Sequence, residues 1–125
     1  MVRAGDTCLA LVRLFGGQRT PSQEELVRQL HYAEAELSIY LAKTLPQHQQ
    51  DALVAWAMSV MGGVTGPQAS IKESELVRRI NAVHYQLAAA EFTKWVYRNG
   101  KVDHGMVKQR AAEQRLFLTG RVVVA

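Results

Sequence analysis

The side chains best suited to chemistry lie in the last third of the chain, where basic residues are mixed with aromatic ones. They are Tyr97, Arg98, Lys101, Lys108, Arg110 and Arg115. Clustered cations attract acidic surfaces and polyanions, and an exposed aromatic ring can anchor a protein partner. We therefore expect a basic helical face that binds another protein with an acidic surface.

Residue patterns typical of enzymes are missing from the sequence. The four histidines do not show the spacing that places two metal ligands on one helix face; they are His31, His48, His84 and His104. Cys8 lies in an apolar run, where a free cysteine acts as a small hydrophobe. We therefore expect a non-enzymatic adaptor or regulator with no metal and no other cofactor. A third possibility, a cytoplasmic enzyme that uses histidine and carboxylate, would need a pocket that brings His31, Glu34 or Glu36 near another polar group.

The segment 22–45 offers a second interpretation of the function. It resembles the helix-turn-helix segment of bacterial and phage regulators, because apolar residues occupy the positions of that pattern, namely Val27, Leu30, Tyr32, Leu37 and Leu41. The resemblance implies a turn at residues 31–33 and a small regulator that binds DNA or RNA. The residues that would then face the groove of the nucleic acid are Ser38, Tyr40 and Lys43.

Several residues depart from the helix-turn-helix pattern. His31 stands where the turn usually has glycine, and Glu34 and Glu36 would place carboxylates against a polyanion. The apolar stripe also continues through Leu30, Ala33 and Leu37 without a change of phase, as one straight helix requires. Protein binding therefore remains our first interpretation and nucleic-acid binding the alternative.

Helices are the elements that must position these side chains. Capping residues and apolar periodicity predict five of them, over residues 6–15, 22–44, 47–61, 70–98 and 103–118. With 125 residues and 48% hydrophobic content, the chain is long and apolar enough for one packed domain spanning residues 1–125. We expect an all-α fold, a compact bundle of about five helices with a basic C-terminal helix.

Two stretches of the chain are similar in sequence. Each has a Gly-Gly pair, a proline, a capping box and a long apolar stripe, which predicts two related helical hairpins over residues 4–45 and 47–98. Either a duplication or the common chemistry of helices explains this similarity. The tail, residues 119–125, ends in an apolar Val-Val-Val run that we expect to pack on its own domain or on a second copy of the chain.

The number of cysteines and the length of the apolar runs indicate the cellular compartment of the protein. The chain has a net charge of +4 and a single cysteine. One cysteine cannot form an internal disulfide, which indicates a reducing and hence cytoplasmic compartment. The uncharged stretch 52–71 is interrupted by Gly62, Gly63 and Pro67, so its apolar part is too short to cross a bilayer. We expect no membrane partner, and a homodimer is compatible with the apolar tail.

Overall fold

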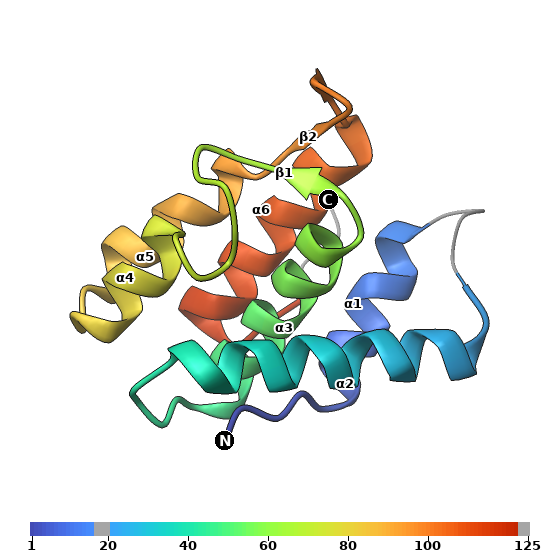
Figure 1. The fold of residues 1–125 in the computed structure, drawn as a ribbon. Helices are drawn as coiled ribbons and strands as arrows, with labels where there is room; N and C mark the ends of the chain where they lie inside the picture. The colour runs from blue at the N-terminus through green and yellow to red at the C-terminus, as the bar shows by residue number, and fades with distance from the viewer. Residues whose placement is uncertain (17–20, 123–125) are drawn as a thin grey trace.

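Six α-helices and three short strands form the part of the chain that the computed structural model describes, residues 1–16 and 21–122. The helices are α1 (Asp6–Gly16), α2 (Gln23–Tyr40), α3 (Gln47–Met61), α4 (Glu75–Asn81), α5 (Tyr85–Glu91) and α6 (His104–Thr119). The strands are β1 (Val64–Thr65), β2 (Tyr97–Arg98) and β3 (Lys101–Val102). Helix α3 packs against α6, α2 and α1, while α5 packs against α6 and α4 against α5 (Figure 1).

Helix α3 is the centre of the core. All residues from Asp51 to Met58 are buried, and a helix that is buried on every side must be enclosed by other elements. Its Trp56 ring meets the ring of Trp95 edge-on, with centroids 5.3 Å apart. Phe92 and Phe117, the latter on α6, extend the aromatic core, with centroids 5.4 Å apart.

Helix α2 is continuous, as its unbroken apolar stripe predicted, so the turn at residues 31–33 that the helix-turn-helix resemblance implied is absent. It begins where expected, because the Ser22 side chain accepts a hydrogen bond from the Glu25 amide at 3.3 Å. The apolar stripe then remains on one face, with Leu30, Ala33 and Leu37 all buried. A helix-turn-helix break would rotate half of this stripe out of the core, and the packing against α3 therefore keeps the helix straight.

The predicted long fourth helix is also wrong, because the chain breaks it at residues 82–84. Val83 adopts a positive φ of 63°, which is unfavourable for a β-branched residue and ends the helical path. Asn81 holds the break by bonding the end of α2: its amide donates to the Tyr40 carbonyl at 2.8 Å and its carbonyl oxygen accepts from the Ala42 amide at 2.9 Å. The second of the two similar stretches therefore contains two short helices where the first contains one long one.

A small antiparallel sheet, in the order β1-β2-β3, accompanies the helices. Arg98 pairs with Lys101 across a two-residue turn, in which Asn99 and Gly100 have φ of 54° and 78°. Positive φ at both central residues is the geometry of a type I′ hairpin. The fold is thus mostly helical, as expected, but it is not a pure bundle of about five helices.

The extended segment before α1 is held by side-chain oxygens of α2 and α3. Four consecutive backbone amides, those of residues 2–5, donate at 2.6–2.8 Å to the side chains of Ser38, Gln50, Glu34 and Asp51, respectively. Buried amides must find acceptors, and here side chains supply what a neighbouring strand would otherwise provide. This segment therefore ties α1 to the α2–α3 pair.

At the other end, Gly120 ends α6 with φ of 76°, and Val122 is exposed. The predicted packing of the tail therefore falls largely outside the described residues. Within the described part of the chain, no helix is long and apolar enough to span a membrane. A single domain and an internal duplication stay predictions.

Candidate functional site

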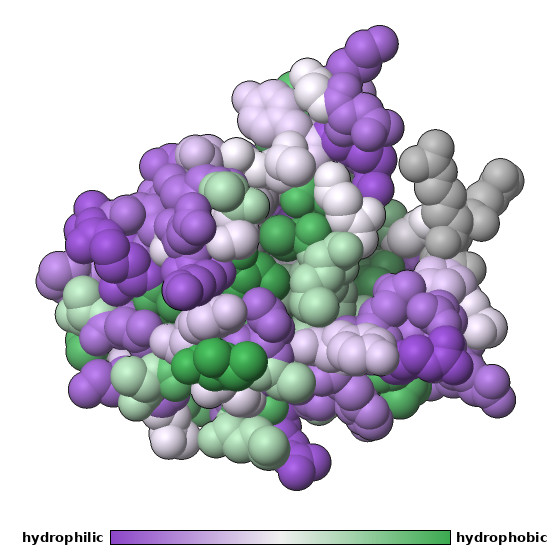
Figure 2. Space-filling view, viewed as in Figure 1, coloured by the Kyte–Doolittle hydropathy of each residue, from purple (hydrophilic) through white to green (hydrophobic). Residues whose placement is uncertain are grey.

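A groove opens between the end of α1, the end of α3 and the start of α6. Its volume is about 560 Å³. Its apolar lining comes mainly from α1 and α3, and includes Val12, Phe15, Leu26, Ala55 and Met58. Figure 2 shows apolar side chains at the centre of this face, between the hydrophilic tip of the β2–β3 hairpin and the hydrophilic beginning of α2.

Polar groups rim the groove and supply hydrogen-bonding capacity. They are Gln29, Ser59, Arg98, Asp103 and Gln109. An apolar concave surface with a few fixed polar groups is the usual character of a small-molecule or oligomer site. The groove is therefore the best candidate site in the described part of the chain.

Asp103 is held in place by both of its carboxylate oxygens. One accepts from the Met106 amide at 3.1 Å and so caps α6, and the other accepts from Arg98 Nε at 3.2 Å. Partial burial alone would raise the pKa of Asp103, but the hydrogen bonds from Met106 and Arg98 outweigh this effect and lower the pKa below its ordinary value. Asp103 therefore faces the groove as an ionised carboxylate at neutral pH.

A buried ion pair is bonded to two residues that line the groove. Arg110 Nη1 lies 2.8 Å from both carboxylate oxygens of Glu113, and both side chains are 0% exposed. Two groove residues bond to this pair: Gln109 donates to Glu113 at 2.9 Å, and Ser59 Oγ accepts from Arg110 Nη2. Burial raises the pKa of Glu113, against the opposing effect of Arg110 and Gln109.

The charges of the groove limit the chemistry that its described lining can perform. Asp103 is the one carboxylate among the described lining residues, and it is held ionised. Such a group can stabilise a developing positive charge, but it is a poor proton donor at neutral pH. Glu113 is fully enclosed and does not line the groove. Across residues 1–16 and 21–122, no three His, Cys, Asp or Glu side chains form a metal-binding group.

The structure separates the residues predicted for protein binding. Tyr97 and Lys101 are exposed on the hairpin, and Arg98 lies at the edge of the groove. Lys108 and Arg115 are exposed on α6, but Arg110 lies in the core with its guanidinium bonded to Glu113. These six side chains therefore do not form one basic helical face.

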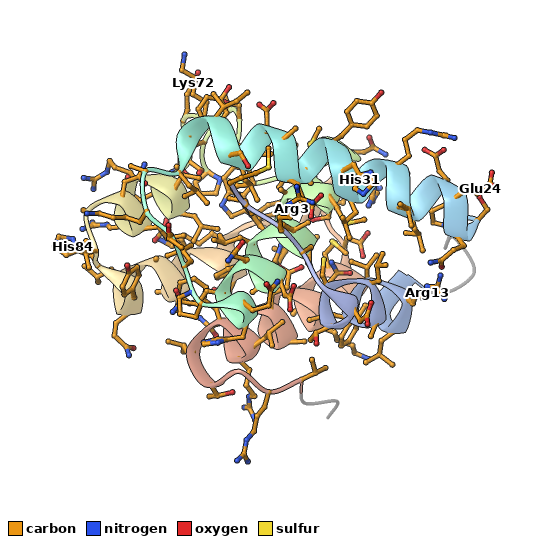
Figure 3. The ribbon with its side chains drawn as sticks, turned by 90° about the horizontal axis from the view of Figure 1, so that it is seen from below. Arg3, Arg13, Glu24, His31, Lys72 and His84 are labelled. Carbon is orange, nitrogen blue, oxygen red and sulfur yellow. The ribbon has the colours of Figure 1, made fainter. Side chains whose placement is uncertain are left out.

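The residues predicted for nucleic-acid binding are likewise not brought together as a surface. Ser38 accepts from the Val2 amide and donates to the Glu34 carbonyl, and Tyr40 packs partly against the core. Lys43 is exposed beyond the end of α2. His31 is exposed, and Figure 3 shows it on α2. Glu34 is bonded to the Ala4 amide, so the alternative site around His31 is not assembled.

The sequence reasoning missed Asp103 and the groove that it lines. Two local signals were present: Asn99-Gly100 is a strong hairpin signal, and Asp103 stands just before a helical pattern, as an N-cap does. Both were interpreted only as the boundary between two helices. The other lining residues are ordinary apolar residues that become neighbours only in the fold.

Comparisons with known proteins give a consistent result. The profile of the phage lysozyme family matches residues 5–113. The endolysin of Bacillus phage B103 is 46% identical over 74 residues, which are 59% of this chain and 26% of that protein. The endolysin of Bacillus phage PZA is 40% identical over 80 residues, 64% of this chain and 29% of that protein. The chain thus spans less than a third of these relatives.

A solved structure shows the same fold. The muramidase domain of SpmX from Asticaccaulis excentricus superposes with a TM-score of 0.75, covering 95% of this chain and 99% of that one, at 20% identity. At this identity the likeness establishes the fold alone.

The family match overturns the functional interpretations made from the sequence. The predictions of a non-enzymatic adaptor, of an acidic protein partner and of a DNA- or RNA-binding regulator are wrong, because the matching family is that of the phage lysozymes and both relatives are endolysins. The basic residues had suggested a macromolecular partner, but charge does not specify which kind. Because its profile match extends over most of the sequence, the chain belongs to the phage lysozyme family.

Proposed function

We propose that this chain acts on bacterial peptidoglycan and that the groove binds the glycan strand for hydrolysis of a bond between two sugars. Membership of the phage lysozyme family supports this substrate class, as do the names of the endolysin relatives and of the muramidase neighbour. The observation that carries the proposal is the groove itself, with the ionised Asp103 carboxylate on its wall.

The groove suits a sugar polymer. Its apolar side chains can pack against the flat faces of sugar rings, while the Gln29 amide can exchange hydrogen bonds with hydroxyl and acetamido groups. Ser59 and Gln109 are bonded to the buried Arg110–Glu113 pair, which fixes this part of the groove wall before a ligand arrives. A strand bound here would meet a wall that is already ordered.

Asp103 supplies one of the two carboxyl functions of a typical glycosidase. The transition state of glycoside hydrolysis resembles a positively charged oxocarbenium ion, which an ionised carboxylate stabilises. The second function, protonation of the leaving oxygen, requires a group that is protonated before the bond breaks. The described lining contains no such carboxyl group, so this function belongs to a group outside that lining.

The test measures binding and cleavage separately. Purified peptidoglycan is incubated with the protein, bound protein is sedimented with the insoluble wall, and new reducing ends are counted in the supernatant. Asp103→Asn is the informative variant, because asparagine caps a helix as well as aspartate but carries no charge. We expect this variant to bind peptidoglycan and to release reducing ends at least about tenfold more slowly, since a lost electrostatic stabiliser costs this much or more.

Glu73→Gln is the matched control, because it removes an exposed carboxylate from the loop before α4. It should leave both measurements unchanged. The proposal is refuted if the parent protein does not sediment with the wall and releases no reducing ends. If Asp103→Asn cleaves the wall as fast as the parent protein, Asp103 takes no part in the reaction. A cytoplasmic location, expected from the single cysteine, stays a proposal that cell fractionation can test.

A further inference from the structure

The β2–β3 hairpin presents two cations at the edge of the groove. Arg98 and Lys101 are directly opposite each other in the antiparallel register, so their side chains leave the same face of the hairpin. Arg98 lines the groove described above and also a second hollow of about 590 Å³, where Lys101 is a further lining residue. The two cavities therefore share Arg98 and Asp103, and Lys101 lies in the second cavity beside them.

The charges of this pair are only partly neutralised. Arg98 donates to Asp103 at 3.2 Å and to the Gly62 carbonyl at 3.3 Å, which fixes its guanidinium. Lys101 is exposed and makes no salt bridge within the described part of the chain. Asp103 is the one acidic residue lining the second hollow, and it already bonds Arg98. The edge of the groove therefore has an excess positive charge.

The register of the hairpin places two like charges opposite each other. Like charges directly opposite each other on neighbouring strands are destabilising. The type I′ turn at Asn99-Gly100 fixes the register, so Lys101 cannot move away by a slip of the strand. An arrangement that costs stability in the free protein is relieved when an anion binds between the two cations.

We propose that Arg98 and Lys101 form a subsite for an acidic group attached to the wall polymer, a carboxylate or a phosphate. This inference rests on the proposed function and adds to it what the groove selects. The sugar rings of peptidoglycan are neutral, and its negative charge is carried by the carboxylates of the peptide stems. The phosphates of wall polymers attached to the glycan are the second source of the same chemistry.

The experiment compares three insoluble ligands at low ionic strength. The first is peptidoglycan from which attached phosphate polymers have been removed, the second is the same wall with those polymers retained, and the third is chitin, a neutral polymer of N-acetylglucosamine. The variant is Lys101→Gln, which removes the unpaired charge and leaves the Arg98–Asp103 contact intact. The control is Lys72→Gln, which removes an exposed lysine from the loop before α4 (Figure 3). Lys72 is not among the residues that line the groove.

We expect Lys101→Gln to bind the stripped peptidoglycan about two- to fivefold more weakly than the parent protein, the range for a solvent-exposed ion pair. Its binding to chitin should be unchanged, and the difference should shrink as salt is added. A loss seen only with the polymer-bearing wall would support the subsite and identify phosphate as its ligand.

Equal binding of the parent protein and Lys101→Gln to both charged walls would overturn the subsite. The same follows if Lys72→Gln weakens binding as much as Lys101→Gln, because the effect would then reflect net charge alone. If the parent protein binds neither chitin nor either wall, the proposed function itself fails. The two failures are therefore distinguishable.

Discussion

The buried Arg110–Glu113 pair leads to a prediction about stability. In Glu113→Ala, Arg110 would lose both 2.8 Å contacts to the carboxylate and would remain charged in a position that is 0% exposed. Its remaining partners, the Trp95 carbonyl at 2.7 Å and Ser59 Oγ, carry no negative charge. Gln109 would lose its 2.9 Å acceptor as well.

Removal of one partner from a buried ion pair typically costs about 3–5 kcal/mol, because an uncompensated charge remains in the interior. We expect a loss near the upper end, since Glu113→Ala also leaves the Gln109 amide without its partner. A domain of this size is stable by about 5–15 kcal/mol, so this one substitution should consume a large part of the total. The unfolding midpoint in urea should fall accordingly.

Urea unfolding followed by tryptophan fluorescence is the assay, because both Trp56 and Trp95 are buried and in mutual contact. The double variant Arg110→Met with Glu113→Leu is the control, since replacing both charges with apolar groups of similar volume is often neutral or stabilising. The reasoning is refuted if Glu113→Ala costs less than about 1 kcal/mol, the range of an exposed pair. It is also refuted if the double variant is as unstable as the single one.

Three further changes test other parts of the structure. Gly66→Ala should cost about 1–3 kcal/mol in urea unfolding, because its Cβ would lie 2.7 Å from Cε3 of the buried Trp95, whereas Gly5→Ala, with its nearest contact at 3.6 Å, should be neutral. The pKa of Asp103 is lowered in the folded state, so its ionised form stabilises the fold above the unfolded-state pKa, and this contribution is lost as the pH falls through the folded-state pKa. Below about pH 4, Asp103→Asn should therefore lose stability less steeply than the parent protein. Equal acid sensitivity of the two proteins would contradict this. Asp51→Ala should lower the thermal midpoint, at a cost of about 1–3 kcal/mol, because the Gly5 amide loses its 2.6 Å acceptor; an unchanged midpoint would show that the segment before α1 contributes little.

The helices were predictable where a local signal and the core agree. At the start of α2, the Ser22 cap and the stripe through Leu30 and Leu37 both point to the same helix, and the structure contains it. At Val83 the two disagree. Val83 and Leu87 continue the apolar period but are each 51% exposed, because the bonds of Asn81 to the end of α2 favour a break. Periodicity records which residues are apolar, and it does not record contacts made forty positions away.

The sheet and the buried charges could not be found by the same reasoning. A strand of two residues is too short to show alternation, so only the Asn99-Gly100 turn indicated the hairpin. Arg110 was expected on the surface because arginine is rarely buried without a partner. Its partner Glu113 lies three positions along the same helix, but that spacing is equally typical of exposed pairs. Burial depends on the neighbouring helices and not on the pair.

The candidate site could not be predicted from the sequence, because Asp103 has several roles in it and the sequence pattern indicates only one of them, the helix cap. Asp103 caps α6, anchors Arg98 of the hairpin and places a negative charge on the wall of the groove. Asparagine can still accept the hydrogen bond from the Met106 amide, but its NH2 group cannot accept the one from Arg98, whereas alanine can accept neither. Asp103→Ala should therefore lose cleavage and both contributions to stability, while Asp103→Asn should lose cleavage and retain the stability that comes from the cap of α6. If the two variants lose cleavage only in proportion to stability, Asp103 supports the groove but does not act on the glycan.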